Sequence, residues 1–452
     1  MLLFSNPEIR RYLWSEFTLL RLIAVPAALL AMFLVGLLKA GAPSTHFLLT
    51  VFALVVIYRG TVVAGRAFRE EVRNKTWDFQ RTSSISPLQL AIGKVLGSTS
   101  YIWYCGFWIY FAAWYAGGLN VENFNVIGSA LIAAGIIGHL TAFAHNVAFQ
   151  KFSSLIGICA AAVTYWAVTR MLGAGVDEVL WYRFSFSRSM FYFFSVVFFS
   201  VWVFRAGVCM LRWQMQYRNL PLDWGLFVVT FGAYFAGFFY EAWAQYFAFY
   251  ISMLFCVYLA FFLEAGNLSG YKRFYYAGKE GQIWRSLENM PRWVLPLFFA
   301  VIVLLLFSQS YALHPTAALL SHQGSLTVFL VAALFFVLRD GLFLHWLFLG
   351  EGGRKYTGFK LFAYYFFLYF LFPAIVMQIV PASVAGDMWT RFIHSVLTED
   401  MTVPMQPWSA LTLFYPSWHP KLVYAVLPVF VQCLALGGLL FLKIRRLRNR
   451  NI

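Results

Sequence analysis

The sequence predicts an all-α polytopic membrane protein with about twelve transmembrane helices in two six-helix halves, each preceded by an interfacial elbow helix. The first observation behind this prediction is the composition: 61% of the 452 residues are hydrophobic and only 12% are charged. Soluble domains are about half apolar and about a quarter charged. Because a spanning helix needs roughly 20 apolar residues, the chain has room for roughly ten to thirteen spans. It has little room for a soluble catalytic domain.

The second observation is the series of long apolar runs, separated by short polar segments. We expect spans at 18–39, 45–65, 99–118, 126–149, 154–172, 188–207, 224–240, 243–263, 294–312, 324–349, 360–382 and 422–442.

The third observation is how the net charge of +16 is distributed. With twelve spans, most of the 34 lysines and arginines fall on one side of the membrane. Positive residues accumulate in cytoplasmic loops, so we expect both termini to be cytoplasmic. The basic surplus then reflects topology, together with attraction to anionic membrane lipids or to a cytosolic partner. Nucleic acid is not an expected partner.

The two halves, residues 1–209 and 210–452, share one plan. Each opens with a basic amphipathic stretch that suits an interfacial helix, at 6–22 and at 210–224. Each half then has two spans, a long cytoplasmic segment, further spans and an external loop. The cytoplasmic segments are 66–98 and 264–293, and the external loops are 173–187 and 383–421. Repeats of this kind usually place a transport pathway between them.

The first cytoplasmic segment contains "EEVRNKTWDFQRTSSISPLQLAIGKVLGS", residues 70–98. Its first part mixes charges and aromatics at helical spacing, and "RTSSISP" then interrupts the helix. Ser86 is placed to cap a second short helix with Pro87 at its first position, and Gly93 and Gly97 permit close packing. A simple connection needs only about five residues. The segment is therefore expected to be a docking surface for a cytosolic protein.

Several short motifs resemble the permease subunits of type 2 ABC transporters, in their fused, double-length bacterial form. They are "NPEIRR" at 6–11, the acidic pair Glu70 and Glu71, "KTWD" at 75–78, "SPL" at 86–88 and "GK" at 93–94. The family usually has a glycine where this chain has Lys75. The stretch that begins "LRDGLFLHWLFLGEGGRK" in the second half is similar to the same family.

The resemblance implies the transmembrane subunit of an ATP-driven exporter in the bacterial inner membrane, which forms the substrate pathway and works by alternating access. ATP and Mg would be bound by separate cytosolic ATP-binding subunits, two copies, and no cofactor would be bound by this chain. Consistent with this, the sequence contains no G-x-x-x-x-G-K-[ST] motif, so we do not expect it to be an enzyme itself.

The resemblance also implies which residues couple to the ATPase. In the first half they are Glu70, Glu71, Arg73, Lys75, Thr76, Trp77 and Asp78, and in the second half Lys279, Glu280, Trp284 and Arg285. Glu70 and Glu71 would pair with basic residues of the ATPase, while Trp77 and Phe79 would anchor the helix to the bundle. A solvated run of charges remains the alternative interpretation of the acidic pair.

Other candidate sites are weaker. Arg59 lies within a predicted span, where it would contact an anionic substrate or extend its side chain to the membrane surface; both interpretations stay open. His139 and His145 are six residues apart and fall on different helix faces, which favours hydrogen-bonded structural histidines. The five cysteines form no C-x-x-C pair. No metal site is predicted.

Two other classes of protein compete with the permease interpretation. A secondary transporter would need carboxylates near the middle of the membrane, and the predicted spans contain none that is well centred. A polytopic lipid-modifying enzyme would need clustered His, Asp, Glu or Ser residues at one membrane face, and no such cluster has catalytic spacing.

Overall fold

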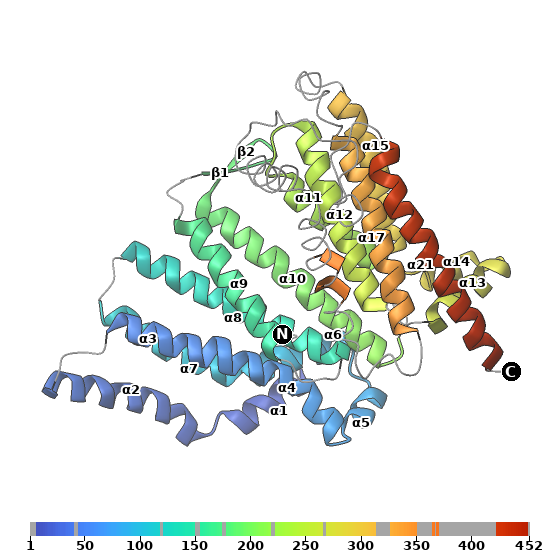
Figure 1. The fold of residues 1–452 in the computed structure, drawn as a ribbon. Helices are drawn as coiled ribbons and strands as arrows, with labels where there is room; N and C mark the ends of the chain where they lie inside the picture. The colour runs from blue at the N-terminus through green and yellow to red at the C-terminus, as the bar shows by residue number, and fades with distance from the viewer. Residues whose placement is uncertain are drawn as a thin grey trace. The chain divides into compact units, whose positions relative to one another are not determined.

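The computed structural model in Figure 1 describes most of the chain as helices. The described residues are 6–39, 44–117, 121–149, 154–173, 178–217, 222–264, 268–312, 326–349, 364–366, 368–369 and 422–450. They divide into two compact units: Met1–Leu180 with Phe184–Asn219, and Trp181–Arg183 with Leu220–Ile452. This division lies close to the predicted boundary at 209/210.

Within its described residues, the first unit contains twelve helical elements, some of them continuous with the next, and most of a two-stranded hairpin, whose residues Trp181–Arg183 belong to the second unit. They are α1 (Pro7–Glu16), α2 (Leu19–Lys39), α3 (Thr45–Phe52), η1 (Ala53–Arg59), α4 (Gly60–Arg73), α5 (Trp77–Thr82), α6 (Pro87–Ile92), η2 (Gly93–Gly97), α7 (Ser98–Tyr115), α8 (Val121–Phe149), α9 (Ser154–Gly173), β1 (Glu178–Trp181), β2 (Phe184–Ser187) and α10 (Arg188–Gln214). Helices α4, α9 and α10 all pack against α8.

The second unit is also helical over its described residues. Its elements are α11 (Leu222–Ala236), α12 (Ala242–Glu264), α13 (Leu268–Lys279), α14 (Ile283–Glu288), α15 (Val294–Ala312), α17 (Leu326–Phe348) and α21 (Leu422–Arg450). Helix α12 packs against α11, α15 and α17, and α17 packs against α21. The core of this unit contains the fully buried side chains of Tyr250, Met253 and Phe307.

Helices occur where the sequence predicts spans, with 360–382 as the one predicted span that lies mostly outside the described residues. Among the described residues, six helical segments are long and apolar enough to cross a membrane: Thr45–Arg73, Asn123–Ala148, Arg188–Gln214, Ala242–Phe261, Leu326–Phe348 and Ala425–Arg446. A seventh is obtained if α1 and α2, which meet at 59°, count as one span. The chain is an all-α, multi-pass membrane protein, and twelve spans remain a prediction.

The two predicted entry helices have different outcomes. Helix α1 begins at Asn6, whose side-chain oxygen accepts hydrogen bonds from the backbone N–H groups of Glu8 (3.0 Å) and Ile9 (3.4 Å). In the second half, the described part of 210–224 contains no separate entry helix, because 210–214 continue α10. Leu211 and Met215 are buried four residues apart and extend the buried stripe of α10.

Two segments of the first unit widen from α-helix to π-helix, at η1 and at η2. In η1, the N–H of Gly60 bonds to the carbonyls of Val55 and Ile57 and skips that of Val56. The freed Val56 carbonyl oxygen lies 2.7 Å from His139 Nε2. His139 is thus a buried, hydrogen-bonded histidine, as the sequence favours.

The close approach predicted for Gly93 and Gly97 is present, and α1 is the element that uses it. A Cβ on Gly93 would lie 2.4 Å from the Cβ of Glu8, and one on Gly97 would lie 2.6 Å from Tyr12 Cδ2. Any side chain at these positions would push α1 away from η2. The capping predicted for Ser86 is also present, since Ser86 and Gln89 form a reciprocal capping box at the start of α6.

We expect Gly93→Ala to destabilise the protein by about 1–3 kcal/mol, because the added methyl group overlaps the base of the Glu8 side chain. The measurement is the unfolding temperature of the purified chain in detergent. Gly437→Ala is the matched control, since nothing lies within 4 Å of a Cβ placed there in α21. Equal unfolding temperatures for the two variants would contradict this account of the α1–η2 contact.

Candidate functional site

The candidate site lies where α1, α4, α5 and η2 of the first unit meet, and a turn between α4 and α5 shapes it. The Thr76 N–H donates to the Glu71 carbonyl (3.0 Å), and the Lys75 N–H donates to the Val72 carbonyl (3.3 Å). This is the Schellman arrangement that ends many helices, with Lys75 in the left-handed conformation (φ 58°). Glycine is the usual residue at such a position, so the turn explains why the resembling family has glycine where this chain has Lys75.

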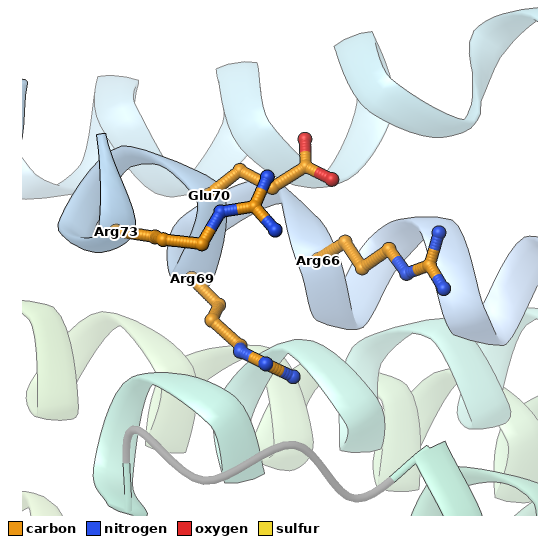
Figure 2. A pocket seen from close by; sticks show the side chains of 4 residues that line it. All are labelled: Arg66, Arg69, Glu70 and Arg73. Atoms are coloured by element: carbon orange, nitrogen blue, oxygen red, sulfur yellow. The ribbon is translucent and has the colours of Figure 1, made fainter.

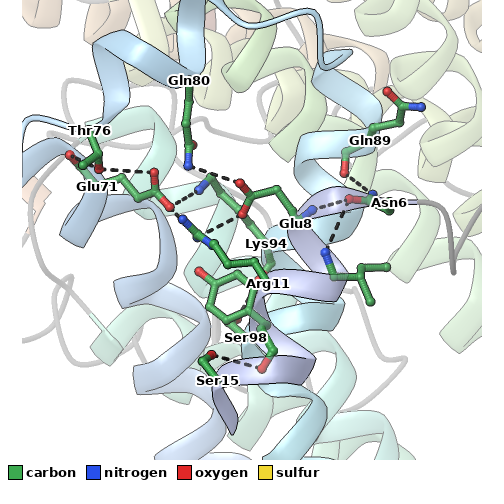
Figure 3. A network of polar contacts seen from close by, with 12 residues as sticks. Asn6, Glu8, Arg11, Ser15, Glu71, Thr76, Gln80, Gln89, Lys94 and Ser98 are labelled. Carbon is green, nitrogen blue, oxygen red and sulfur yellow. Dashed lines mark hydrogen bonds and ion pairs between the residues drawn. The ribbon is translucent and has the colours of Figure 1, made fainter.

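A cluster of four charged side chains joins α1 to α4 and η2 (Figure 3); Glu8, Glu71 and Lys94 are buried, and Arg11 closes the cluster from the solvent side. One carboxylate oxygen of Glu71 accepts from Arg11 Nη2 (2.7 Å) and pairs with Lys94 Nζ (2.8 Å). The same Arg11 nitrogen lies 3.0 Å from Glu8 Oε2. The Lys94 side chain is fully buried, and Glu71 and Glu8 are 6% and 5% exposed. The cluster contains two positive and two negative groups.

Two uncharged side chains, Gln80 and Asn6, connect this cluster to the neighbouring helices. Gln80 Nε2 of α5 donates to Glu8 Oε1 (3.2 Å), and Asn6 Nδ2 donates to the Gln89 carbonyl of α6 (2.7 Å). Burial lowers the pKa of Lys94, and the adjacent Glu71 carboxylate counteracts this effect. The carboxylate therefore keeps a buried ammonium group in place.

Glu71 is consequently not available to a partner protein. The sequence analysis assigned it to an ion pair with the ATPase, but its carboxylate points into the protein and pairs with Lys94 and Arg11. Its neighbour Glu70 is exposed. Successive residues of a helix differ by about 100° in direction, so only one carboxylate of the pair can face the bundle.

The remaining residues assigned to ATPase coupling in the first half also divide into exposed and buried side chains. Arg73, Lys75, Thr76 and Asp78 are exposed. Trp77 is buried, with its ring 4.7 Å from that of Phe68, and it anchors α5 as predicted. Phe79 is 82% exposed, so the prediction that it anchors the helix is wrong. It lies about 200° around α5 from Trp77 and therefore points away from the bundle.

The second unit repeats the turn. Gly281 has φ 69°, the Gln282 N–H donates to the Ala277 carbonyl (2.9 Å), and the Gly281 N–H donates to that of Gly278 (3.1 Å). As α5 follows the first turn, the six-residue helix α14 follows this one. Trp284 in α14 is 81% exposed.

The other residues assigned to the second coupling segment are exposed too: Lys279, Glu280 and Arg285. Nearby, Glu264 at the end of α12 accepts a hydrogen bond from the backbone N–H of Arg292 (2.8 Å). Burial raises the pKa of Glu264 to about 7 although the Arg292 guanidinium is 3.8 Å away. Glu264 thus pairs with Arg292, which precedes the next long helix, α15.

A pocket of about 400 Å³ lies on the outer face of α4 and is lined by Arg66, Arg69, Glu70 and Arg73 (Figure 2). Arg66, Glu70 and Arg73 are exposed, and Arg69 is half-buried. Their spacing of three, four and seven residues places them along one side of the helix. Arg59, the possible contact of an anionic substrate, precedes Arg66 by seven residues and is exposed in η1.

A second buried ion pair, Arg339 with Asp340, lies within α17 and is 1% and 0% exposed. Although adjacent residues of a helix point about 100° apart, Arg339 Nη2 and Nε donate directly to Asp340 Oδ1 (2.8 and 2.9 Å). Tyrosine hydroxyls complete the site by donating to Asp340: Tyr258, Tyr364 and Tyr369. These tyrosines are far apart in the sequence, so their spacing does not predict that they meet at Asp340.

We expect Lys75→Gly to stabilise the protein by about 1 kcal/mol, because glycine adopts the left-handed conformation without the strain of a Cβ. The unfolding temperature in detergent should rise. Lys75→Ala is the control: it removes the same charged side chain but keeps the Cβ, so it should give little or no gain. A gain of equal size for alanine would show that the charge, and not the backbone, is responsible.

We expect Lys94→Met to destabilise the protein by about 3 kcal/mol, because Glu71 loses its fully buried cationic partner and keeps only the exposed Arg11. Adding Glu71→Gln should recover part of this loss, since the double variant removes the uncompensated charge. Arg81→Gln is the control, because Arg81 pairs with Asp78 only at 3.6 Å and in an exposed position. Simple addition of the two single losses would contradict the direct pairing.

Comparison with known proteins identifies no relative: no protein-family model, no curated protein and no solved structure matches the chain. The permease interpretation therefore depends on the motifs of the sequence and on the geometry described above.

Proposed function

We propose that this chain is the transmembrane subunit of an ATP-driven ABC exporter, and that two cytosolic ATP-binding subunits dock on it, one for each unit. The observation that carries the proposal is the repeated arrangement at α4–α5 and α13–α14. In each unit a helix ends in a Schellman turn, and a six-residue helix follows with a large apolar side chain in solvent, Phe79 or Trp284. Aromatic side chains are enriched at protein–protein interfaces relative to the rest of the surface.

The charges around these two side chains suit a partner with a mixed surface. Lys75 and Asp78 are exposed near Phe79, and Lys279, Glu280 and Arg285 are exposed near Trp284. Aromatic anchors surrounded by charged residues are the usual composition of a transient interface. Glu71 is excluded from this surface and serves to hold it in place.

Movement of the docked subunit can be transmitted because the first docking helix is joined rigidly to a long helix. The segment Thr45–Arg73 is continuous over 29 residues, which corresponds to a length of about 44 Å. The ion cluster fixes α1 and η2 to its end. Displacement of α5 therefore moves the predicted spans that begin the unit, and alternating access of a pathway for hydrophobic or amphipathic cargo would follow.

The competing secondary transporter is less well supported. Asp340 is the carboxylate that lies within a candidate span of the described second unit, and a proton or sodium carrier would need it to be available. Both of its oxygens already accept hydrogen bonds, from Arg339 and from tyrosine hydroxyls. This arrangement suits a structural ion pair.

The proposal is tested by replacing Phe79 and Trp284, one at a time, with a photo-crosslinking amino acid in cells. We expect each position to capture a protein with Walker A and Walker B motifs. In the purified complex in nanodiscs, Phe79→Asp should lower the cargo-dependent ATPase rate about thirtyfold, since loss of an interface anchor costs about 2 kcal/mol.

Phe184→Asp is the matched control, because Phe184 is equally apolar and 69% exposed but lies in the hairpin of the predicted external loop. It should leave the ATPase rate unchanged. Absence of any ATP-binding protein from both crosslinking positions, or an ATPase rate that no change in this chain affects, would overturn the proposed function.

A further inference from the structure

The pocket on the outer face of α4 has a composition that the proposed function does not explain. Its lining of three arginines and one glutamate carries a formal charge of +2. The arginines extend over seven residues, Arg66 to Arg73, or about 10 Å along the helix. In Figure 2, Glu70 and Arg73 lie beside each other, Arg66 lies further along the helix, and Arg69 extends from a neighbouring side of it. A protein-docking surface does not require this concentration of guanidinium groups.

Guanidinium groups select for phosphate. Each presents a planar fork of N–H donors that matches two oxygens of a phosphate or carboxylate, and it stays charged at any physiological pH. A phosphate monoester carries about −1.5 to −2 charges at neutral pH, because its second pKa is about 6. Such a group balances the +2 charge of the pocket, whereas a carboxylate or a phosphate diester supplies only one negative charge.

The position of the pocket along the chain indicates where the phosphate comes from. The helix that carries it is the last part of the candidate span Thr45–Arg73. Apolar residues occupy this helix up to Arg66, apart from Arg59 and a few small or polar side chains, and charged residues follow from Arg66 onward. The transition marks the level at which a spanning helix leaves the hydrocarbon for the headgroups. Arginines at this level are close to lipid phosphates, and clusters of them bind anionic headgroups.

We propose that Arg66, Arg69 and Arg73 form a binding site for the phosphate monoester headgroup of an anionic membrane lipid. The Glu70 carboxylate repels the bound anion and so limits how much negative charge the site accepts. The site belongs to the first unit alone. It does not depend on the proposed ATP-binding partner, and so its failure and that of the proposed function are distinguishable.

The experiment measures lipid binding to the purified full chain, without any partner, by native mass spectrometry in detergent. The probes are phosphatidic acid, which is a phosphate monoester, phosphatidylglycerol, which is a diester, and phosphatidylcholine, which has no net charge. We expect phosphatidic acid to bind most tightly. Arg66→Gln and Arg73→Gln should each weaken its binding about tenfold, the loss expected for one charge-assisted hydrogen bond.

Glu70→Gln gives the opposite prediction: removal of the negative charge should strengthen phosphatidic acid binding several-fold. Arg81→Gln on α5 is the control for a general loss of surface charge and should have no effect, since Arg81 lies outside the pocket. All of the substituted side chains are exposed, and an unchanged unfolding temperature verifies that each variant is folded.

Inorganic phosphate, added as a competitor, distinguishes the source of the group. Tight binding of phosphatidic acid that millimolar phosphate does not displace supports the lipid. Displacement by inorganic phosphate at that concentration would overturn the lipid assignment in favour of a soluble anion. Equal binding by Arg66→Gln, Arg73→Gln and Arg81→Gln, or weaker binding by Glu70→Gln, would overturn the site itself. Either of these two results, equal binding by the arginine variants or weaker binding by Glu70→Gln, would favour a protein as the ligand of this face of α4.

Discussion

The first unit depends on one buried ion pair, between Glu71 and Lys94. An ammonium group without solvent contact is stable only beside a carboxylate, so this pair requires α4 and η2 to lie within one side-chain length of each other. Arg11 adds α1 to the same carboxylate oxygen, and Glu8 balances the remaining charge. The glycines of η2 allow α1 to come this close. The ion pairs thereby join α1, α4 and η2 around one charged centre, although Glu8 and Lys94 lie far apart in the chain.

This inward use of Glu71 determines what the surface can do. Because α4 directs Glu71 towards the bundle, its other side presents Glu70 and Arg73, and because α5 directs Trp77 inward, its other side presents Phe79. The outer side holds two features that suit different ligands: the apolar ring of Phe79 on α5, which suits a protein, and the arginines of α4, which suit a phosphate. The two features are close in the sequence but lie at different distances from the apolar span. The arginines belong to the last turns of the span helix, whereas Phe79 lies beyond the turn that ends it.

Local sequence patterns were sufficient for the features that depend on neighbouring residues. Apolar runs predicted where helices occur, the Ser86–Pro87 pair predicted the start of α6, and the spacing of Gly93 and Gly97 predicted a close contact. They failed where the outcome depends on which way a helix faces, because contacts with distant segments decide this. Such contacts turned Glu71 inward and Phe79 outward, and they gave Glu264 its partner Arg292. The number of spans is a further case: α7 is rich in tyrosine and tryptophan, whose polar atoms lower its mean hydropathy, so length and composition alone do not class it as a span.

The two docking segments share a backbone but not the contacts that hold it. Counted back four residues from the left-handed position, Glu71 of the first unit corresponds to Ala277 of the second, and alanine cannot form an ion pair. The left-handed residue itself is a lysine in the first unit and a glycine in the second. Both turns have the same pair of backbone hydrogen bonds, but the first is strained at its left-handed lysine and is also fixed by the ion cluster, whereas the second is relaxed at its glycine. A force applied to α5 acts on the ion cluster and so on several helices at once. A force applied to α14 passes through a turn with no such cluster at the corresponding position. If two identical ATP-binding subunits dock as proposed, the same motion of each would produce a larger displacement of spans in the first unit.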